Sequence, residues 1–300
     1  MNEQKSSEII HVCPENFSLL QYILKKMLHL KESGIQIALQ RSSNEVANRV
    51  SYNDVKEIQN LHVFAALARI RNYCDARKVK IDYKNIDTII VKSNPFIVLL
   101  GIAGIYNSVN NKLSFSLASA TTHELLHALS THYEKEQGKY RSGFKIHSFF
   151  YALNEGYTEL LASRIEKRPP DGYPEQIKLV RLVESLFDSK EEMMQAYFDN
   201  NLEVVFQKIG EYMPRKEVTR LLLKEDKALR RQMQTAFIGL IGKDSVPQRL
   251  ALYQAVVTNC QDFNQLERFL RVAAEDKELQ VALRLTNAVS SIKETISRSR

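Results

Sequence analysis

Two histidines and a glutamate stand within five residues of one another, in the order His123-Glu124-Leu125-Leu126-His127. Histidines four residues apart on a helix project from the same face, so both imidazole rings can reach one metal ion. Glu124 lies about 100° further round the same helix, beside the metal and not under it. This position suits a general base that takes a proton from a metal-bound water. The five residues therefore predict a catalytic zinc site.

A second group of acidic residues follows on another predicted helix, in Ala152-Leu-Asn-Glu-Gly-Tyr-Thr-Glu159. A catalytic zinc ion normally has three protein ligands and keeps its fourth position for water, so one more ligand is needed. Glu155 and Glu159 are four residues apart and share a helix face. One of them can bind the metal while the other accepts the ring N–H of a ligating histidine. Apolar neighbours predict that this helix is buried, and two buried carboxylates need a cation or hydrogen-bond donors nearby.

The combination His123-Glu124-x-x-His127 and Asn154-Glu155-x-x-x-Glu159 resembles the gluzincins, the thermolysin-like division of the zinc metallopeptidases. The resemblance covers residues 105–165. It implies a zincin-like core, in which a small sheet packs on the motif helix, and one Zn²⁺ ion per chain. It further implies that His123, His127 and Glu155 are the ligands, that Glu124 is the general base, and that Glu159 is the partner of a ligating histidine.

A second division of zinc peptidases, the metzincins, is excluded by two positions. That pattern needs glycine at position 130 and histidine at position 133, where this chain has Ser130 and Tyr133. His132 is out of register by one residue and points about 140° away from His127 on a helix. We therefore assign His132 a loop or surface role. Structural roles are expected for the N-terminal histidines, which are His11, His29 and His62.

The residue that would stabilise the oxyanion stays open. Thermolysin uses a histidine from its second domain, and this chain has no histidine after His147. The donor is then His147 itself, a tyrosine or an arginine. The tyrosine candidates are Tyr140, Tyr157 and Tyr197, and Tyr140 with Arg141 could also form a lid.

Hydrophobic periodicity predicts the elements that position these residues. Helix-period apolar residues run from about 15 to 75, with a distinct run at 55–73. The pattern then becomes β-branched and alternating, and it predicts short strands at 79–83, 88–91, 97–100 and 112–117, with the apolar segment 96–105 as a buried strand. Asn110-Asn111 predicts a hairpin turn, because asparagine tolerates positive φ.

The motif helix is expected to begin at Thr121 or Thr122, either of which can act as its cap, or equally a few residues earlier, and to run to about Tyr133. A polar loop at 134–143 and a second helix at 149–164 follow. Everything beyond Pro174 reads as helical, with breaks near Pro214, 239–242 and Pro247. We expect an α+β fold with an N-terminal helical segment at 1–77, a zincin-like catalytic core at 78–170 and a helical C-terminal region at 171–300.

Composition limits the classes of protein. The 300 residues are 44% hydrophobic and 26% charged, which suffices for a buried core. The net charge of +7 combines 42 basic with 35 acidic residues, so a solvated surface is favoured over a nucleic-acid role. Cys13, Cys74 and Cys260 are far apart and odd in number, which predicts reduced, buried thiols. Without a signal peptide or a long apolar segment, we expect a cytoplasmic protein, or one exported without a cleaved signal.

The expected function is a zinc metallopeptidase that hydrolyses a protein or peptide substrate, and an endopeptidase rather than an exopeptidase. The strand at 113–117, or the one near Ile105, would bind extended peptide at its edge. One alternative is a catalytically silent zinc-binding protein in which the basic tail is an interaction module, since the last ninety residues hold 16 basic and 11 acidic residues. The other is an effector or toxin protease exported without a signal. An intact Glu124 argues against the silent protein.

Overall fold

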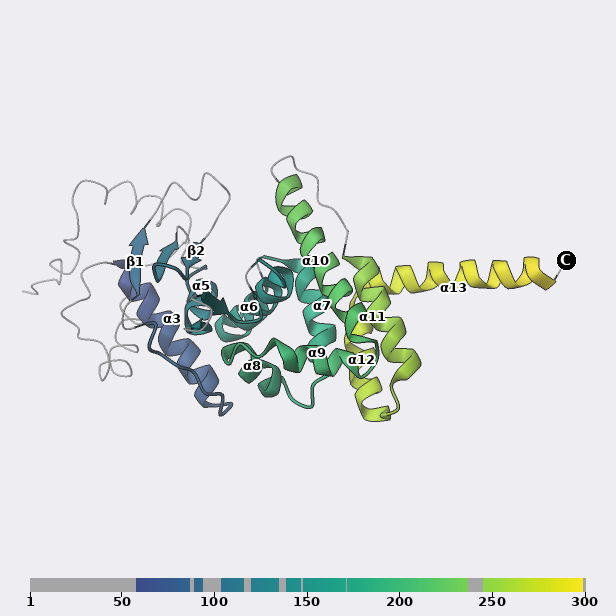
Figure 1. The fold of residues 1–300 in the computed structure, drawn as a ribbon, viewed down its shortest axis with the longest axis horizontal. Coiled ribbons are helices and arrows are strands. Elements are labelled where there is room, and N and C mark those ends of the chain that lie inside the picture. Colours follow the sequence, from purple (N-terminus) through teal and green to yellow (C-terminus); the bar gives the residue numbers. More distant parts are fainter. Residues whose placement is uncertain are drawn as a thin grey trace, which may run out of the picture. The chain divides into compact units, whose positions relative to one another are not determined.

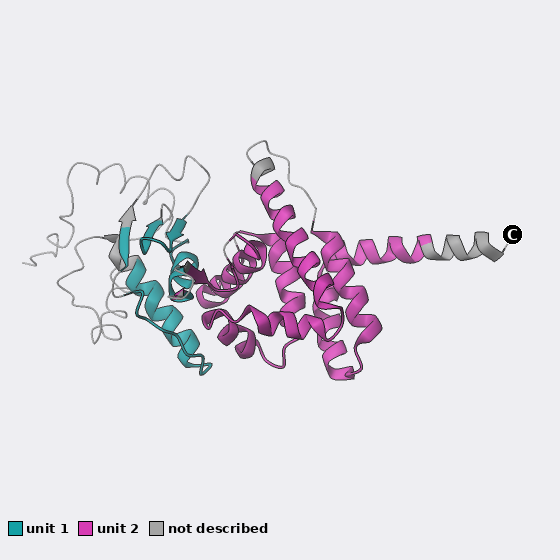
Figure 2. Ribbon diagram, viewed as in Figure 1, with its two compact units in different colours: residues 1–131 teal, residues 132–300 magenta. Residues whose placement is uncertain are grey.

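The described part of the chain is of the α+β class and mostly helical (Figure 1). The computed structural model describes residues 58–86, 89–93, 104–115, 120–134, 139–146, 148–170, 172–236 and 245–298. Within these ranges it contains ten helices and five short strands. The chain divides into two compact units, Met1–Thr131 and His132–Arg300, called the N-terminal and the C-terminal unit below (Figure 2). The expected mixed class is confirmed at this coarse level.

The described part of the N-terminal unit is a three-stranded sheet with two helices. Its elements are α3 (Ile58–Asp75), β1 (Ile90–Ser93), β2 (Gly104–Asn107), β3 (Lys112–Phe115) and α5 (Thr121–Leu129). The strand order is β1-β3-β2, with β1 parallel and β2 antiparallel to β3. α5 packs against α3 and β2, and Ile70, Leu113 and Leu125 are fully buried. Among the described strands, β3 is thus central and β2 lies at an edge.

The hairpin between β2 and β3 confirms the turn predicted at Asn110-Asn111. Asn111 has a φ of 48°, a conformation that asparagine adopts more readily than most residues. Its side chain accepts a hydrogen bond from the Tyr106 hydroxyl (2.9 Å) and donates one to the Asn85 carbonyl (2.6 Å). Side-chain hydrogen bonds therefore hold the turn in addition to its backbone conformation.

The strand predicted at 79–83 is wrong, because these residues form no regular element. α3 ends in a turn where Lys78 has a φ of 59°, and the Val79 N–H donates to the Cys74 carbonyl (3.0 Å). Val79 is buried against the end of the helix, so the β-branched pattern here reflects burial and not strand pairing. The expectations for 15–57 and for the strand at 97–100 lie outside the described residues.

α5 is the predicted motif helix, but it ends at Leu129 and not near Tyr133. The hydroxyls of Ser130 and Thr131 both donate to the His127 carbonyl, at 3.2 and 2.6 Å. These short side chains satisfy a carbonyl that another helical turn would otherwise have engaged. The helix therefore ends two residues after its second histidine.

β4 (Thr131–Glu134) and β5 (Lys139–Ser142) form a two-stranded sheet where the sequence predicts the helix end and a polar loop. The prediction of a loop over the whole of 134–143 is therefore wrong for β5. The β-branched and aromatic residues Thr131 and Tyr133 favour a strand. His132 lies half-buried on β4, and its Nε2 donates to the Phe198 carbonyl (2.8 Å), which gives it a structural role.

The C-terminal unit is built from helices around the one predicted at 149–164. That helix is α6 (Tyr151–Glu166), and its extent differs from the prediction by two residues at each end. It is followed by α7 (Pro174–Glu184), α8 (Lys190–Phe198), α9 (Leu202–Gly210), α10 (Arg215–Ala236), α11 (Val246–Asn259), α12 (Phe263–Glu275) and α13 (Lys277–Arg298). α6 packs against α7 and α10. The predicted break at Pro214 is confirmed between α9 and α10, whereas Pro247 lies in the first turn of α11.

A buried ion network joins α7, α11 and α13 within the C-terminal unit. The guanidinium of Arg249 is fully buried and contacts Glu175 (2.8 Å), Asp276 (2.6 Å) and Glu278 (3.1 Å). Lys178 pairs with Glu175 at 2.7 Å and also with Glu278. A buried cation is tolerated only with such partners. The network therefore fixes α13 at its first turn, and the rest of that helix extends away from α11 and α12 (Figure 1).

Two of the three cysteines lie among the described residues. Cys74 is a free, buried thiol, and burial raises its pKa to about 12. Cys260 is also free but only half-buried, so the expectation of a buried thiol is wrong there. In the described ranges, every helix is too short or too polar to cross a membrane.

Candidate metal centre

The nine residues of α5 are all buried, including the two histidines and the glutamate. The helix follows Ala120, which makes no side-chain cap hydrogen bond, so the predicted cap at Thr121 or Thr122 is wrong. Leu125, Leu126 and Leu129 are 0–1% exposed and anchor the helix in the core of the N-terminal unit. The His-Glu-x-x-His residues are thus held by apolar packing on a short, rigid helix.

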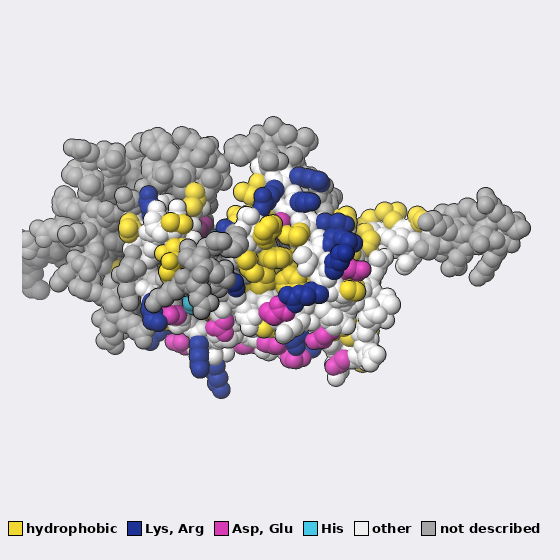
Figure 3. Space-filling model, in the orientation of Figure 1, with side chains coloured by type: hydrophobic (Ala, Val, Ile, Leu, Met, Phe, Trp, Pro, Cys, Tyr) yellow, Lys and Arg dark blue, Asp and Glu magenta, His cyan; other side chains and the backbone are white. Residues whose placement is uncertain are grey.

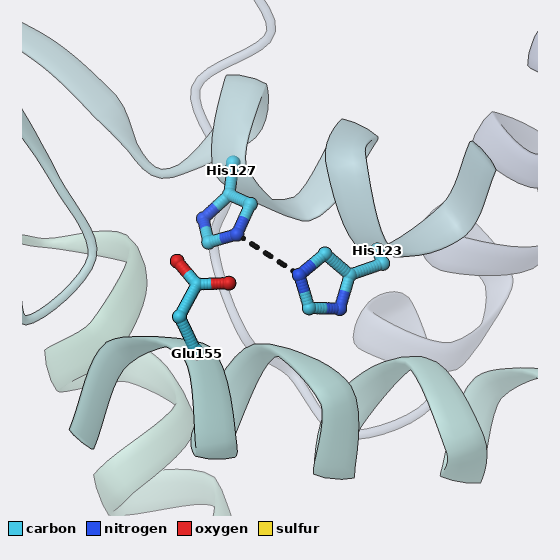
Figure 4. Close-up of side chains that lie close together, drawn as sticks. All are labelled: His123, His127 and Glu155. Atoms are coloured by element: carbon cyan, nitrogen blue, oxygen red, sulfur yellow. Dashed lines mark hydrogen bonds between the residues drawn. The ribbon is translucent and has the colours of Figure 1, made fainter. Parts of the chain in front are cut away.

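The two imidazoles of α5 face each other through the same ring atom. His123 Nε2 and His127 Nε2 are 3.1 Å apart, and the rings meet edge to face at an interplanar angle of 73° (Figure 4). Two N–H groups cannot point at each other across such a gap, so at most one of the two nitrogens is protonated. The pair therefore presents at least one nitrogen lone pair to the space between the rings.

This nitrogen separation fits a shared metal ion. Two histidine nitrogens at 2.0–2.1 Å from a tetrahedral zinc ion stand about 3.3 Å apart. The observed distance of 3.1 Å is slightly shorter, and a slightly smaller N–Zn–N angle would account for the difference. Both imidazoles are also buried, with 6% and 8% exposure, so the protein and not the solvent surrounds the nitrogens that would bind the ion. The chemistry and the spacing of the pair agree with the predicted ligand role.

Glu124 lies against a glycine of the edge strand β2. A methyl group added at Gly104 would stand 2.7 Å from Glu124 Cγ, 3.1 Å from its Oε1 and 3.0 Å from Ala120 Cβ. Only a residue without a side chain fits there, because real Cβ atoms do not approach carbon so closely. Glycine at this point of β2 therefore lets the Glu124 carboxylate lie directly beside the strand backbone.

The helix that carries Glu155 and Glu159 is capped by a residue far away in the sequence. Phe150 precedes α6 with a φ of 60° and makes no side-chain cap hydrogen bond of its own. Asp226 on α10 accepts hydrogen bonds from the backbone N–H of Phe150 (2.7 Å) and of Ala152 (2.8 Å). A carboxylate at a helix N-terminus satisfies free N–H groups and favours the helix dipole. Asp226 thereby fixes the start of the helix just before Glu155.

A close contact with α7 fixes the same turn of α6 from the side. A methyl group at Gly156 would lie 2.8 Å from Gln176 Cβ and 2.9 Å from its backbone carbon. Next to it, Asn154 Oδ1 accepts a hydrogen bond from the Phe144 N–H (2.9 Å). Gly156 and Asn154 flank Glu155, so packing against α7 and a hydrogen bond to the preceding loop hold its backbone.

His123, His127 and Glu155 form a group of metal-ligating side chains (Figure 4). One ligand atom from each residue lies within 4.8 Å of the others, and all three residues are buried. Zinc would bring such atoms to about 3.3 Å, so the carboxylate needs a shift of up to about 1.5 Å. Two imidazole nitrogens and one carboxylate are a set typical of catalytic zinc sites. The predicted ligands thus meet the requirements of zinc in number, chemistry and burial.

Glu159, predicted to orient a ligating histidine, is bound by an arginine. Its Oε1 accepts a hydrogen bond from Arg168 (3.0 Å), which also donates to the Pro169 carbonyl (3.0 Å). Both charged groups are largely buried, with side chains 5% and 18% exposed. The ion pair accounts for one carboxylate oxygen of Glu159, and its contact to a histidine stays a prediction.

The oxyanion candidates lie in different settings. Tyr197 is fully buried, and its hydroxyl shares a hydrogen bond with Thr158 (2.8 Å). Tyr157 is also fully buried, with its ring 5.3 Å from that of Tyr197. Tyr140 on β5 is 38% exposed and packs against Tyr133. His147 lies outside the described residues. The roles of these four residues as oxyanion donors stay predictions. The ring of Tyr197 packs in a buried aromatic cluster with Phe144 and Tyr157.

Three residues of this region were missed by reasoning from the sequence. Gly104 belongs to the apolar segment 96–105, and its proximity to Glu124 has no sequence signal. Asp226 lies 74 residues after the backbone N–H of Ala152 that it binds, so no local pattern could pair them. Arg168 stands two residues after the end of α6, where a basic residue facing Glu159 could have been proposed from spacing.

Comparison of the chain with protein-family models, curated proteins and solved structures found no match. The gluzincin resemblance therefore rests on the motif residues alone.

Proposed function

We propose that this protein is a zinc-dependent metallopeptidase of the gluzincin type, built on a zincin-like core. His123, His127 and Glu155 would hold the ion, and Glu124 would act as the general base. The observation that carries the proposal is the 3.1 Å separation of the two Nε2 atoms, with a Glu155 oxygen in the same buried group. A silent zinc-binding protein would have no use for a carboxylate at position 124 beside that pair.

Zinc bound at these residues would supply Lewis acidity, which polarises a carbonyl and lowers the pKa of water. Glu124 would then take the proton from the attacking water and deliver it to the nitrogen of the leaving amine. Its carboxylate lies beside Gly104, within a largely apolar and buried helix environment. Proton transfer from such a fixed position requires little reorganisation, because the side chain is confined by the strand.

The substrate would be an extended peptide segment that pairs with β2. β3 is bonded to β1 on one side and to β2 on the other, so the alternative binding edge near 113–117 is excluded. β2 has only β3 as a neighbour among the described strands, and Gly104 on it contacts Glu124. Main-chain pairing gives affinity with little side-chain selection. This supports an endopeptidase acting on protein chains.

The decisive experiment compares wild-type protein with Glu124→Gln in both zinc content and hydrolysis of an unfolded casein substrate. Both proteins should hold about one zinc ion per chain by elemental analysis, because Glu124 is not a ligand in the proposal. Only wild type should release new peptide N-termini. Glu124→Gln keeps the shape of the side chain and removes its basicity, so it changes the proposed chemistry and little else.

Two results would contradict the proposal in different ways. Wild-type protein purified without zinc, and unable to bind it from solution, would remove the metal centre. Zinc bound equally by both proteins, with no cleavage by either, would favour the silent zinc-binding protein. Identification of new N-termini in a cell lysate treated with each protein would then define the substrate and the cleavage preference.

A further inference from the structure

A groove runs along the exposed face of α10, and it is lined by residues from one side of that helix. Its volume is about 400 Å³, and the described residues that line it are Lys216, Thr219, Arg220, Leu223, Lys224 and Lys227. Four of the six side chains are cationic and none is acidic. They recur every three or four residues, so they form one stripe about 16 Å long.

Several basic residues near the groove form ion pairs within the C-terminal unit. Arg215, one residue before the groove, pairs with Glu203, and Lys208 pairs with Asp188. Among the residues that the structure describes, no ion pair or hydrogen bond involves the side chains of Lys216, Arg220, Lys224 or Lys227. Their charges are therefore available to a ligand.

Of the three acidic residues of α10, only Glu217 in the first turn is exposed, so the cations of the groove outnumber the exposed acids of the helix. Glu225 and Asp226 are 1% and 4% exposed and bind donors inside the unit: Glu225 accepts from Gln176 and Ser245, and Asp226 caps α6. Like charges three or four residues apart on a helix repel one another. Figure 3 shows Lys and Arg side chains, in dark blue, gathered around the position of α10 in Figure 1. The helix thus presents a concentrated positive field to one side.

We propose that this groove binds an acidic polypeptide segment of a partner protein, at a surface separate from the metal centre. Glutamates repeated every three or four residues on a partner helix would match the cations, which follow one another about 4.5–6 Å apart along α10. Leu223 is half-buried among the lining residues and offers an apolar contact at the centre of the stripe. Charge complementarity of this kind gives fast association and selects acidic partners.

Nucleic acid and membrane fit the groove less well. Among the described residues of the lining there is no aromatic side chain on which an unpaired base could stack. Duplex DNA carries one phosphate per about 1.7 Å, far denser than a single row of four cations. An interfacial membrane helix needs a broad apolar face, and the described part of this lining offers one large apolar residue, Leu223.

Fluorescence anisotropy tests the proposal with the full-length protein and a labelled helical peptide whose glutamates repeat at the spacing of the four cations. The probe should bind wild type, and a peptide with glutamine at those positions should not. Arg220→Glu/Lys224→Glu should weaken binding at least tenfold, and raising the salt concentration should weaken wild-type binding, because exposed charges are screened. The milder Arg220→Gln/Lys224→Gln should give a smaller loss in the same direction.

The matched control is Lys190→Glu/Lys277→Glu, which changes the net charge equally at two exposed helix N-termini, where glutamate is favourable. It should bind the acidic peptide within a factor of two of wild type. Equal binding by Arg220→Glu/Lys224→Glu and wild type would overturn the proposal. So would tighter binding of a single-stranded RNA oligonucleotide, or of phosphatidylserine vesicles, that is lost in the same variant.

Discussion

Replacing Gly104 by alanine tests whether the position of Glu124 against β2 governs catalysis. The new methyl group would stand 2.7 Å from Glu124 Cγ, whereas ordinary contacts begin at 3.4 Å. The Cγ atom must therefore retreat by about 0.7 Å, and the rest of the carboxylate moves with it because Cγ lies close to the backbone. Ala120 Cβ, at 3.0 Å, leaves little room for the methyl group to escape.

The expected result is a selective loss of turnover. A displacement approaching 1 Å of a catalytic group can cost up to about a hundredfold in rate. We expect kcat on a quenched fluorescent peptide to fall by about ten- to a hundredfold, or about 1.4–2.7 kcal/mol of activation free energy. Zinc content should be unchanged, since the three atoms nearest to the new methyl group belong to Glu124 and Ala120 and not to a histidine. Overpacking should lower the free energy of unfolding by about 1–3 kcal/mol.

Two controls separate this effect from general damage. Gly210→Ala places a methyl group where no atom lies within 4 Å, so it should leave kcat unchanged. In a protein that already carries Glu124→Gln, Gly104→Ala should cause no further loss of rate, because the group it displaces is no longer a base. A Gly104→Ala variant that retains wild-type kcat would refute the link between the strand and the base.

Two further predictions concern α10. Asp226→Ala removes both acceptors from the N-terminus of α6. We therefore expect the free energy of unfolding in urea to fall by about 1–3 kcal/mol, and zinc to bind more weakly. Unchanged stability and zinc affinity would show that Asp226 does not position the helix. Burial raises the pKa of Glu225 above its usual 4.5. This effect is larger than the opposite effect of the hydrogen bonds from Ser245 and Gln176 and of the charge of Arg249, which lower the pKa. The folded state therefore holds this proton more tightly than the unfolded state, and the stabilisation present below about pH 4.5 is lost as pH rises through the raised pKa. Glu225→Gln does not titrate and keeps an oxygen acceptor for both donors, so its stability relative to wild type should increase from pH 4 to pH 7; a difference independent of pH would contradict the assignment.

Reasoning from the sequence succeeded where the signal is local. The His-Glu-x-x-His spacing requires a helix to bring both imidazoles together, and α5 supplies it. The apolar neighbours of Glu155 and Glu159 predicted a buried helix, which α6 confirms. The turn at Asn111 followed from the tolerance of asparagine for positive φ. Each of these properties is set within a few residues along the chain.

Reasoning from the sequence failed where alternative hydrogen bonds decide how a helix ends. The end of α5 depends on hydroxyls that compete for the His127 carbonyl, and the segment after it pairs as a strand. The irregular path of 79–83 depends on bonding back to α3. β-branched residues favour burial as well as strands, so their pattern alone could not separate the two.

The sequence by itself determined which residues can bind a metal and which can act as a base, because these depend on side-chain chemistry and on spacing within single helices. Only the tertiary structure decided that Gly104 of β2 lies against Glu124, and that Asp226 of α10 caps the helix of Glu155. It also decided that β2, and not β3, has an available edge among the described strands. Contacts between residues far apart in the chain arise from packing, which no local spacing encodes.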